Sequence, residues 1–227
     1  MKTLVSVAIG EKYQAIASWT FPIMDAYAKK IGADFRIITE VRHHGTFPMW
    51  EKLQVGRLLD SYDRVAFVDA DIVIRPWADD LFKVVPSESF GIHNEAIGKQ
   101  AVERLTWLRA AMKRFRVQGA SNAYYNTGVM VFSKRHKITF GNPPAYHDGP
   151  LEEQNWINVN LCRWNIGIFN LPSTMNFVRP LYPDENLRRD AQFMHYATYP
   201  TKELDELHRD VLFHYPGIKQ RLVGEVI

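Results

Sequence analysis

The segment RVAFVDADIVI, residues 64–74, contains the pattern from which the architecture of this chain can be inferred. An apolar run, Val65–Val68, leads into two aspartates separated by one small residue, and a second apolar run, Ile72–Ile74, follows. A short apolar run rich in β-formers is typical of a buried strand, so Asp69 and Asp71 lie where such a strand ends. Burying an unpaired carboxylate costs on the order of several kcal/mol. We therefore expect both carboxylates to face an arginine, a lysine or a metal ion, and we favour a metal ion.

Strands and helices alternate before and after this segment. Strands are predicted at Leu4–Ile9 and Asp34–Thr39, and helices at Tyr13–Ile31, with a kink or break at Pro22, and from Pro48 to about Tyr62. Strand, helix, strand, helix, strand is the order of a parallel α/β sheet, in which ligands collect at the carboxyl ends of the strands. Asp69 and Asp71 are at such an end.

The second half of the chain continues the alternation. Further elements are predicted as a short helix at Trp77–Val84, strands at Phe90–His93, Tyr124–Phe132 and Ile166–Leu171, and helices at Ala101–Arg116, Glu152–Leu161 and about Thr201–Leu212. The helix at Ala101–Arg116 is amphipathic, with an apolar side formed by Val102, Leu105, Leu108, Met112 and Phe115. For its basic residues, Arg104, Arg109, Lys113, Arg114 and Arg116, we favour a solvated surface over an acceptor-contacting or membrane-contacting one. We expect one domain over residues 1–227, with a C-terminal helical extension from about residue 200.

Composition excludes several classes of protein. The chain has 227 residues, 46% of them hydrophobic, which is enough for one substantial core. The net charge of +3 gives no strong field toward nucleic acid, so we expect no nucleic-acid partner. Cys162 is the single cysteine, which excludes an intramolecular disulfide and is most simply a core residue. We find no stretch of roughly 18 apolar residues, so we expect no transmembrane segment and a cytoplasmic protein, with a peripheral membrane contact left open.

The two aspartates have the chemistry of a site for a hard divalent cation. Mg²⁺ and Mn²⁺ take oxygen ligands, and a pair of carboxylates at a strand end could hold such an ion on a diphosphate. An Asp-x-Asp pair by itself is common, and surface carboxylates or helix caps are the alternative explanation. Neither a Gly-x-x-x-x-Gly-Lys loop nor a Gly-x-Gly-x-x-Gly fingerprint is present, which disfavours kinase-like and dinucleotide-binding functions.

Several segments together resemble a known family. WEKLQVGRLLDSYDRVAFVDADIVI, residues 50–74, is similar to the helix, strand and metal motif of the GT-A glycosyltransferases, in particular glycosyltransferase family 8, the glycogenin-like and lipopolysaccharide galactosyltransferase group. YYNTGVMVF (124–132), EEQNWIN (152–158) and FMHYA (193–197) resemble further motifs of that family in the same order. The resemblance extends from Leu4 to about Lys202. It implies a Rossmann-like α/β fold with a mostly parallel central sheet flanked by helices.

The resemblance also implies an activity and a donor site. The family moves a hexose from a nucleoside diphosphate sugar to an acceptor hydroxyl with retention, and UDP-glucose or UDP-galactose is the donor we expect. Asp69 would contact the ribose and the metal ion, while Asp71 and His195 would be ligands of Mn²⁺ or Mg²⁺. For His195 the alternative is a hydrogen-bonded core histidine, but the order of the motifs favours a ligand.

Three further residues correspond to donor-binding positions. Tyr13 resembles the aromatic residue that stacks on the nucleotide base, although the buried face of the first helix explains it equally well. Lys52 resembles the basic residue ahead of the metal motif. Lys202 could reach the diphosphate, but it could equally be a surface charge at a helix start, and Thr198 occupies a position where the family usually has glycine.

Candidate catalytic residues are Gln154, Glu153 and Asn126. Gln154 would lie near the reacting face of the sugar, and Asn126 could bind sugar hydroxyls or simply cap a turn. Glu153 stands where the family commonly has aspartate; it could hold a sugar hydroxyl or polarise the acceptor, or it could be an acid favoured by a helix N-terminus.

Two other functions remain open from the sequence. One is a nucleotidyltransferase, and the other is a non-catalytic module of the same fold that binds a nucleotide sugar. The acceptor, whether carbohydrate, glycolipid or protein, is not indicated by any residue.

Overall fold

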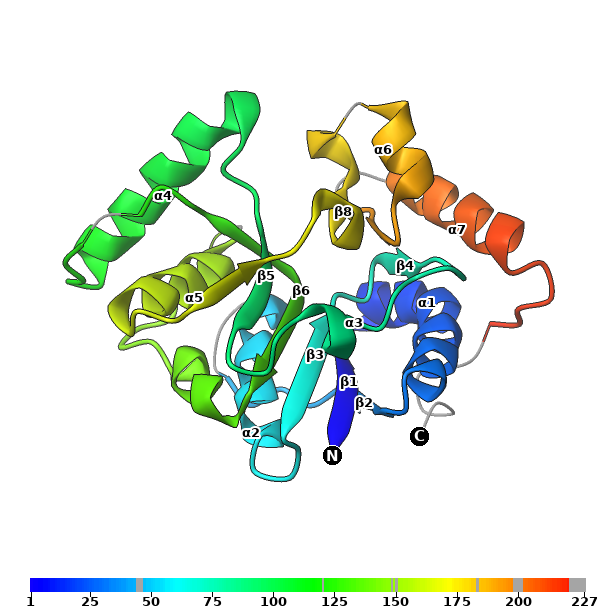
Figure 1. Cartoon of the computed structure of the whole chain (residues 1–227), viewed down its shortest axis with the longest axis horizontal. Coiled ribbons are helices and arrows are strands. Elements are labelled where there is room, and N and C mark those ends of the chain that lie inside the picture. Colours follow the sequence, from blue (N-terminus) through cyan, green and yellow to red (C-terminus); the bar gives the residue numbers. More distant parts are fainter. Residues whose placement is uncertain are drawn as a thin grey trace.

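The fold is described here from a computed structural model, shown in Figure 1, which covers residues 1–43, 47–119, 121–147, 149, 151–182, 184–197 and 202–220. The side chains of Pro180, Lys202 and Glu203 lie outside this description. Within these ranges, no helix is both long and apolar enough to cross a membrane.

A six-stranded sheet forms the centre of the molecule. Its order is β2 (Asp34–Ile38), β1 (Lys2–Val7), β3 (Arg64–Val68), β6 (Tyr125–Ser133), β5 (Phe90–Asn94) and β7 (Ile168–Asn170). β6 is antiparallel to both of its neighbours, β3 and β5, whereas the other pairs, β1–β2, β1–β3 and β5–β7, are parallel. The prediction of a mostly parallel sheet is therefore confirmed.

A smaller sheet was not predicted. It has the order β4 (Ile72–Ile74), β9 (Phe193–His195) and β8 (Phe177–Val178), with β4 antiparallel to β9. The chain passes from the large sheet to the small one between β3 and β4, so the two aspartates lie at the junction of the sheets.

Helices cover both faces of the large sheet, as Figure 1 shows. The α-helices are α1 (Glu11–Lys30), α2 (Val55–Leu58), α3 (Leu81–Val84), α4 (Ala101–Arg114), α5 (Glu152–Arg163), α6 (Glu185–Asp190) and α7 (Lys202–His214). Short 3₁₀ segments occur at Pro48–Gln54, Gly98–Gln100, Lys134–Phe140, Ser173–Met175 and Arg179–Leu181. In the view of Figure 1, α4 and α5 lie on the left of the sheet, and α1 and α7 lie on the right.

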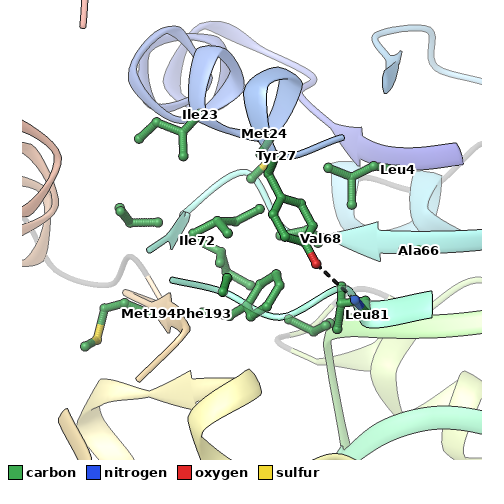
Figure 2. Close-up of a cluster of buried hydrophobic side chains, with 14 of the residues drawn as sticks. Leu4, Ile23, Met24, Tyr27, Ala66, Val68, Ile72, Leu81, Phe193 and Met194 are labelled. Atoms are coloured by element: carbon green, nitrogen blue, oxygen red, sulfur yellow. Dashed lines mark hydrogen bonds between the residues drawn. The ribbon is translucent and has the colours of Figure 1, made fainter. Parts of the chain in front are cut away.

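Alternate residues along the strands of the large sheet pack into two separate hydrophobic cores, one on each face. Ala66 and Val68 of β3 pack into the cluster formed with α1 and the small sheet, while Val65 and Phe67 pack into the cluster formed with α4 and α5. Alternate residues of a strand point to opposite faces, so each apolar run fills both cores. Figure 2 shows the first core, where Tyr27 of α1 packs against Phe193 of β9 and its hydroxyl accepts a hydrogen bond from the backbone N–H of Leu81.

Most predicted elements are confirmed within a few residues, with some exceptions. α1 runs through Pro22 without the predicted break. Of the predicted helix at Trp77–Val84 only α3 is helical, and the predicted helix from Pro48 to about Tyr62 is a 3₁₀ segment followed by α2. Cys162 is only half-buried, so it is not a full core residue.

Two assignments on α4 were wrong. Val102 is 76% exposed, because the helix begins beyond the edge of the core, which it enters at Leu108. Arg104 is not part of a solvated surface: its side chain is 12% exposed and forms an ion pair with Glu95.

The prediction of one domain over residues 1–227, with an extension from about residue 200, stays a prediction. Leu207 and Val211 of α7 are buried in the same cluster as α1, and the rings of Trp19 and His208 lie 4.8 Å apart.

Candidate active site

The turn between β3 and β4 fixes both aspartates. The backbone N–H of Asp69 donates to the carbonyl of Gly128 at 2.8 Å, which extends the pairing of β3 with β6 by one residue. The carbonyl of Asp69 then accepts from the N–H of Ile72 at 3.1 Å, closing the turn. Thr20 of α1 donates its hydroxyl to the carbonyl of Ala70 at 2.6 Å. The backbone that carries Asp69 and Asp71 is therefore held on three sides.

Pairing of β4 with β9 brings in a histidine from far along the chain. Ile72 lies opposite His195 in the antiparallel register, and the N–H of Tyr196 donates to the carbonyl of Asp71 at 3.1 Å. His195 Nε2 is consequently 3.4 Å from Asp71 Oδ1 and 3.9 Å from Asp69 Oδ2. The predicted metal ligands thus converge, with one ligand atom from each lying within 4.8 Å of the others.

These separations fit one divalent cation. Two atoms that each bind a small hard cation at about 2.1 Å lie at most about 4.2 Å apart, and both distances from His195 are shorter than that. Two carboxylates and one imidazole are ligands that Mn²⁺ accepts, and the carboxylates also suit Mg²⁺. Asp69, Asp71 and His195 could therefore hold such an ion, since one ligand atom from each lies within 4.8 Å of the others.

Lys52 links the turn at residues 69–71, called the aspartate turn below, to helix α5. Its Nζ lies 3.0 Å from Asp69 Oδ2 and 3.2 Å from Glu153 Oε1, and it donates to Thr127 Oγ1 at 3.4 Å. Burial opposes the charge on this ammonium, but the carboxylates of Asp69 and Glu153 outweigh burial and raise the pKa of Lys52. Burial also raises the pKa of Asp69, an effect that Lys52 reduces and Asp71 increases. The lysine therefore stabilises negative charge in a largely buried site.

One pocket is lined by eight of the predicted site residues. These are Tyr13, Lys52, Asp69, Asp71, Asn126, Glu153, Gln154 and His195. They come from α1, the 3₁₀ segment at Pro48–Gln54, the aspartate turn, β6, α5 and β9. The side chain of Lys202, the ninth predicted residue, and Thr198 lie outside the described part of the chain.

The position of Tyr13 is compatible with both predicted roles, a residue of the buried helix face and a residue of the donor site. Its ring packs partly against the core beneath α1, and it also lines the pocket. Burial raises the pKa of Tyr13, and the nearby carboxylates of Asp71 and Asp69 raise it further. The phenol is therefore neutral beside the aspartates, and stacking on a nucleotide base stays a prediction.

Two of the three candidate catalytic residues have polar atoms without a hydrogen-bond partner among the described residues. Glu153 and Gln154 are each 2% exposed; Glu153 Oε2 makes no hydrogen bond there, and Gln154 Nε2 makes none of good geometry, although the Gln154 side chain lies beside the hydroxyl of Tyr124. Gln154 Oε1 accepts from the backbone N–H of Thr127 at 3.0 Å, which fixes the amide. Buried polar atoms normally have partners, so these two atoms suit a ligand that supplies them.

Asn126 differs because its amide is already bonded. Its Nδ2 donates to Glu95 Oε2 at 2.7 Å, and its Oδ1 accepts from the N–H of Gly128 at 2.9 Å and from Asn176 Nδ2 at 2.9 Å. Asn126 lines the pocket, and its bond from the N–H of Gly128, two residues on, is the turn cap that was the alternative, here within a buried network. Binding of sugar hydroxyls by this residue stays a prediction.

Close packing around His195 explains the glycine of the Asn-Thr-Gly segment. A Cβ on Gly128 would lie 2.5 Å from His195 Cε1 and 2.7 Å from its Nδ1. The absence of a side chain at Gly128 therefore lets the imidazole of His195 lie against the backbone of β6.

Some residues at the site were not anticipated from the sequence. Leu151 and Ala197 line the pocket with φ values of 64° and 45°, a region that residues other than glycine seldom adopt. Oδ1 of Asn176 lies 3.0 Å from Nδ1 of the His195 ring. A single asparagine in a loop far from any motif carries no sequence signal, so only the fold reveals this contact.

Solved structures share this architecture. No family model matches the sequence, and no match was found among curated proteins. A glycosyltransferase involved in glycosylation of the major capsid of PBCV-1 aligns over 92% of this chain and 98% of its own, with 14% identity and a TM-score of 0.62. The galactosyltransferase LgtC, in complex with donor and acceptor sugar analogues, aligns over 92% and 95%, with 16% identity and a TM-score of 0.54.

A third structure, the bifunctional glycosyltransferase WbbM, aligns over 94% of this chain and 50% of its own, with 12% identity and a TM-score of 0.59. At these identities the similarity concerns the fold. The chain therefore has the GT-A fold, and its structure resembles those of glycosyltransferases of the family 8 type.

Proposed function

We propose that this protein is a metal-dependent glycosyltransferase that moves a hexose from a nucleoside diphosphate sugar to an acceptor hydroxyl. UDP-glucose or UDP-galactose is the proposed donor, and retention at the anomeric carbon is the proposed outcome. The observation that carries this proposal is the convergence of Asp69, Asp71 and His195 in one pocket at the carboxyl end of β3. In an α/β sheet, this is the edge at which nucleotides bind.

The donor set fits a divalent cation on a diphosphate. A bound Mn²⁺ or Mg²⁺ would neutralise the diphosphate and stabilise the extra charge that it gains on leaving. Asp71 and His195 would hold the ion, and Asp69 would contact both the ion and the ribose. Lys52 holds Asp69 in place at 3.0 Å, so the position of this ligand does not depend on the ion alone.

The sugar would face helix α5. Glu153 Oε2 and Gln154 Nε2 are buried and without partners among the described residues, so they are an acceptor and a donor for hydroxyl groups. Gln154 would lie near the reacting face, and Tyr13 would stack on the base. Among the described residues, the carboxylates that line the pocket are those of Asp69, Asp71 and Glu153. The first two belong to the proposed metal site and the third is paired with Lys52, so none of them is left to serve as a nucleophile. Front-face displacement, with the departing phosphate accepting the proton of the acceptor hydroxyl, suits this arrangement.

A donor screen tests the proposal. The protein would be mixed with Mn²⁺, a panel of nucleotide sugars and candidate acceptors, and release of the nucleoside diphosphate would be followed with and without a chelator. We expect release from one donor, dependent on the metal ion. Release of pyrophosphate instead would indicate a nucleotidyltransferase, and binding of a nucleotide sugar without any release would indicate a non-catalytic module.

Location and partners beyond the donor stay predictions. We propose a cytoplasmic protein without a nucleic-acid partner, acting on a carbohydrate, glycolipid or protein acceptor.

A further inference from the structure

A chain of buried hydrogen bonds connects helix α4 to the imidazole of His195. Arg104 forms an ion pair with Glu95, and Asn126 Nδ2 donates to Glu95 Oε2 at 2.7 Å. Asn176 Nδ2 donates to Asn126 Oδ1 at 2.9 Å, and Asn176 Oδ1 is 3.0 Å from His195 Nδ1. Of these residues only Asn126 and His195 line the pocket.

The direction of each bond in this chain follows from the chemistry of its ends. A carboxylate only accepts hydrogen bonds, so Asn126 must turn its NH₂ group toward Glu95. The oxygen of Asn126 must then face the other way, and the N–H of Gly128, which can only donate, contacts that oxygen at 2.9 Å. Two independent neighbours therefore require the same orientation of the Asn126 amide.

The orientation of the Asn126 amide determines which ring nitrogen of His195 carries the hydrogen. Asn176 faces the oxygen of Asn126, so it places its NH₂ group there and directs its own oxygen at His195. An amide oxygen only accepts, so Nδ1 of His195 carries the hydrogen. In the neutral imidazole the lone pair is then on Nε2. This is the atom that lies 3.4 Å from Asp71 Oδ1, in the proposed metal site.

The residues of this hydrogen-bond chain are buried, so water cannot readily reverse the direction of its bonds. Asn176 is 0% exposed, and Glu95, Asn126 and His195 are 2%, 7% and 6% exposed. Solvent therefore has little access to supply a donor or acceptor of the opposite sense at any of these positions.

We propose that Asn176 is a positioning residue that fixes the metal-binding tautomer of His195, and that Glu95 sets the direction of the hydrogen-bond chain from beyond the pocket. This inference rests on the proposed function, because it treats Nε2 of His195 as a metal ligand. Metal-bound histidines commonly donate their other N–H to such a partner, and loss of that partner typically weakens metal binding about 10-fold to 100-fold.

The tautomer can be measured in the metal-free protein. Long-range ¹H–¹⁵N correlation of the histidine rings, assigned by comparison with His195→Ala, distinguishes a hydrogen on Nδ1 from one on Nε2. Nε2 faces the carboxylate of Asp71, which only accepts, so without the ion Nε2 can carry a hydrogen as well. The diagnostic atom is therefore Nδ1: we expect it to carry a hydrogen in the wild-type protein and to lose it in a detectable fraction of Asn176→Ala. A wild-type His195 with its only hydrogen on Nε2 would overturn the inference, whether or not the protein binds a metal ion.

Glu95→Gln tests the chain at its distant end. A glutamine would keep its oxygen on Arg104 and present NH₂ to Asn126, where a donor already lies, so the chain must reverse or break. The N–H of Gly128 still favours the original orientation of Asn126, so we expect a detectable fraction of His195 in the Nε2–H form, although the substituted residue does not contact it. An unchanged tautomer in a folded Glu95→Gln protein would show that Glu95 does not set the direction.

Metal affinity gives a second readout. Titration with Mn²⁺, followed by the electron paramagnetic resonance signal of the free ion, should show binding about 10-fold to 100-fold weaker in Asn176→Ala than in the wild-type protein. Asn160→Ala is a matched control, since Asn160 is 1% exposed and donates to the carbonyl of Thr139, away from the pocket. Its Mn²⁺ affinity should equal that of the wild-type protein.

The outcomes separate the two proposals. If the wild-type protein does not bind Mn²⁺, the metal-dependent function fails, while the ring spectra still decide the tautomer. If the wild-type protein binds Mn²⁺ and Asn176→Ala binds it equally well, with His195 unchanged, the positioning role fails and the metal site stands.

Discussion

Replacing Gly128 with alanine should damage the metal site without touching any charged group. The added Cβ would lie 2.5 Å from His195 Cε1, whereas non-bonded carbon atoms prefer separations of about 3.5 Å or more. The imidazole would have to retreat by about 1 Å, and its neighbour Asn176, which is fully buried, leaves it little room. His195 Nε2 would then leave its position beside Asp71.

The size of the effect follows from the cost of overpacking. Extra methyl groups in a packed interior cost about 1–3 kcal/mol. If that cost falls on holding His195 at the ion, it corresponds to a loss of about 5-fold to 150-fold in Mn²⁺ affinity, since about 1.4 kcal/mol is a factor of ten.

Titration with Mn²⁺ measures this loss, and urea unfolding measures any part of the cost that falls on stability. Gly167→Ala is the control, because a Cβ there has no neighbour within 4 Å and the backbone is not in the left-handed region. If Gly128→Ala bound Mn²⁺ as tightly as the wild-type protein and unfolded at the same urea concentration, His195 could not occupy the position described here.

Four further substitutions and a change of pH have defined outcomes. Asp71→Ala should abolish metal-dependent release of nucleoside diphosphate and leave the circular dichroism spectrum unchanged; unaltered turnover would show that another carboxylate holds the ion. Lys52→Met should lower the free energy of unfolding by about 3–5 kcal/mol in urea titrations, because it leaves two carboxylates buried without their cation. The surface change Lys137→Met should cost less than about 1 kcal/mol, and equal losses in the two variants would refute the role of burial. Burial lowers the pKa of His93 below 6.5, so the unfolded chain binds this proton at higher pH than the folded one, and the melting temperature should fall as the pH drops through 6.5. His93→Gln should make that fall shallower, and an equally steep fall would exclude His93 as a contributor.

The strands could be predicted because each is a short apolar run that fills two cores at once. Val65–Val68 illustrates this, since alternate residues pack into different clusters. The small sheet could not be predicted, because its strands are only two or three residues long and are defined by pairing between distant segments. Periodicity also misplaced Val102, since an amphipathic pattern does not say where along a helix the core begins.

The site shows the same division. Asp69 and Asp71 are separated by one residue, so local pattern indicated them, and the family resemblance supplied the order in which His195 follows. The partners that hold these residues are not local. Glu95 and Asn176 are separated from His195 by long stretches of chain, and Lys52 pairs with Glu153 across the fold. The approach of His195 to Asp71 in turn depends on β4 pairing with β9, for which no residue pattern exists.

Locating a bound ion would decide whether Asp71 and His195 hold a metal ion together. Crystals grown with Mn²⁺ and UDP would be measured by anomalous diffraction at the manganese absorption edge. We predict one strong peak in the pocket, at bonding distance, about 2.1 Å, from a carboxylate oxygen of Asp71 and from Nε2 of His195. UDP bound in the pocket with no manganese peak beside these two residues would contradict the account.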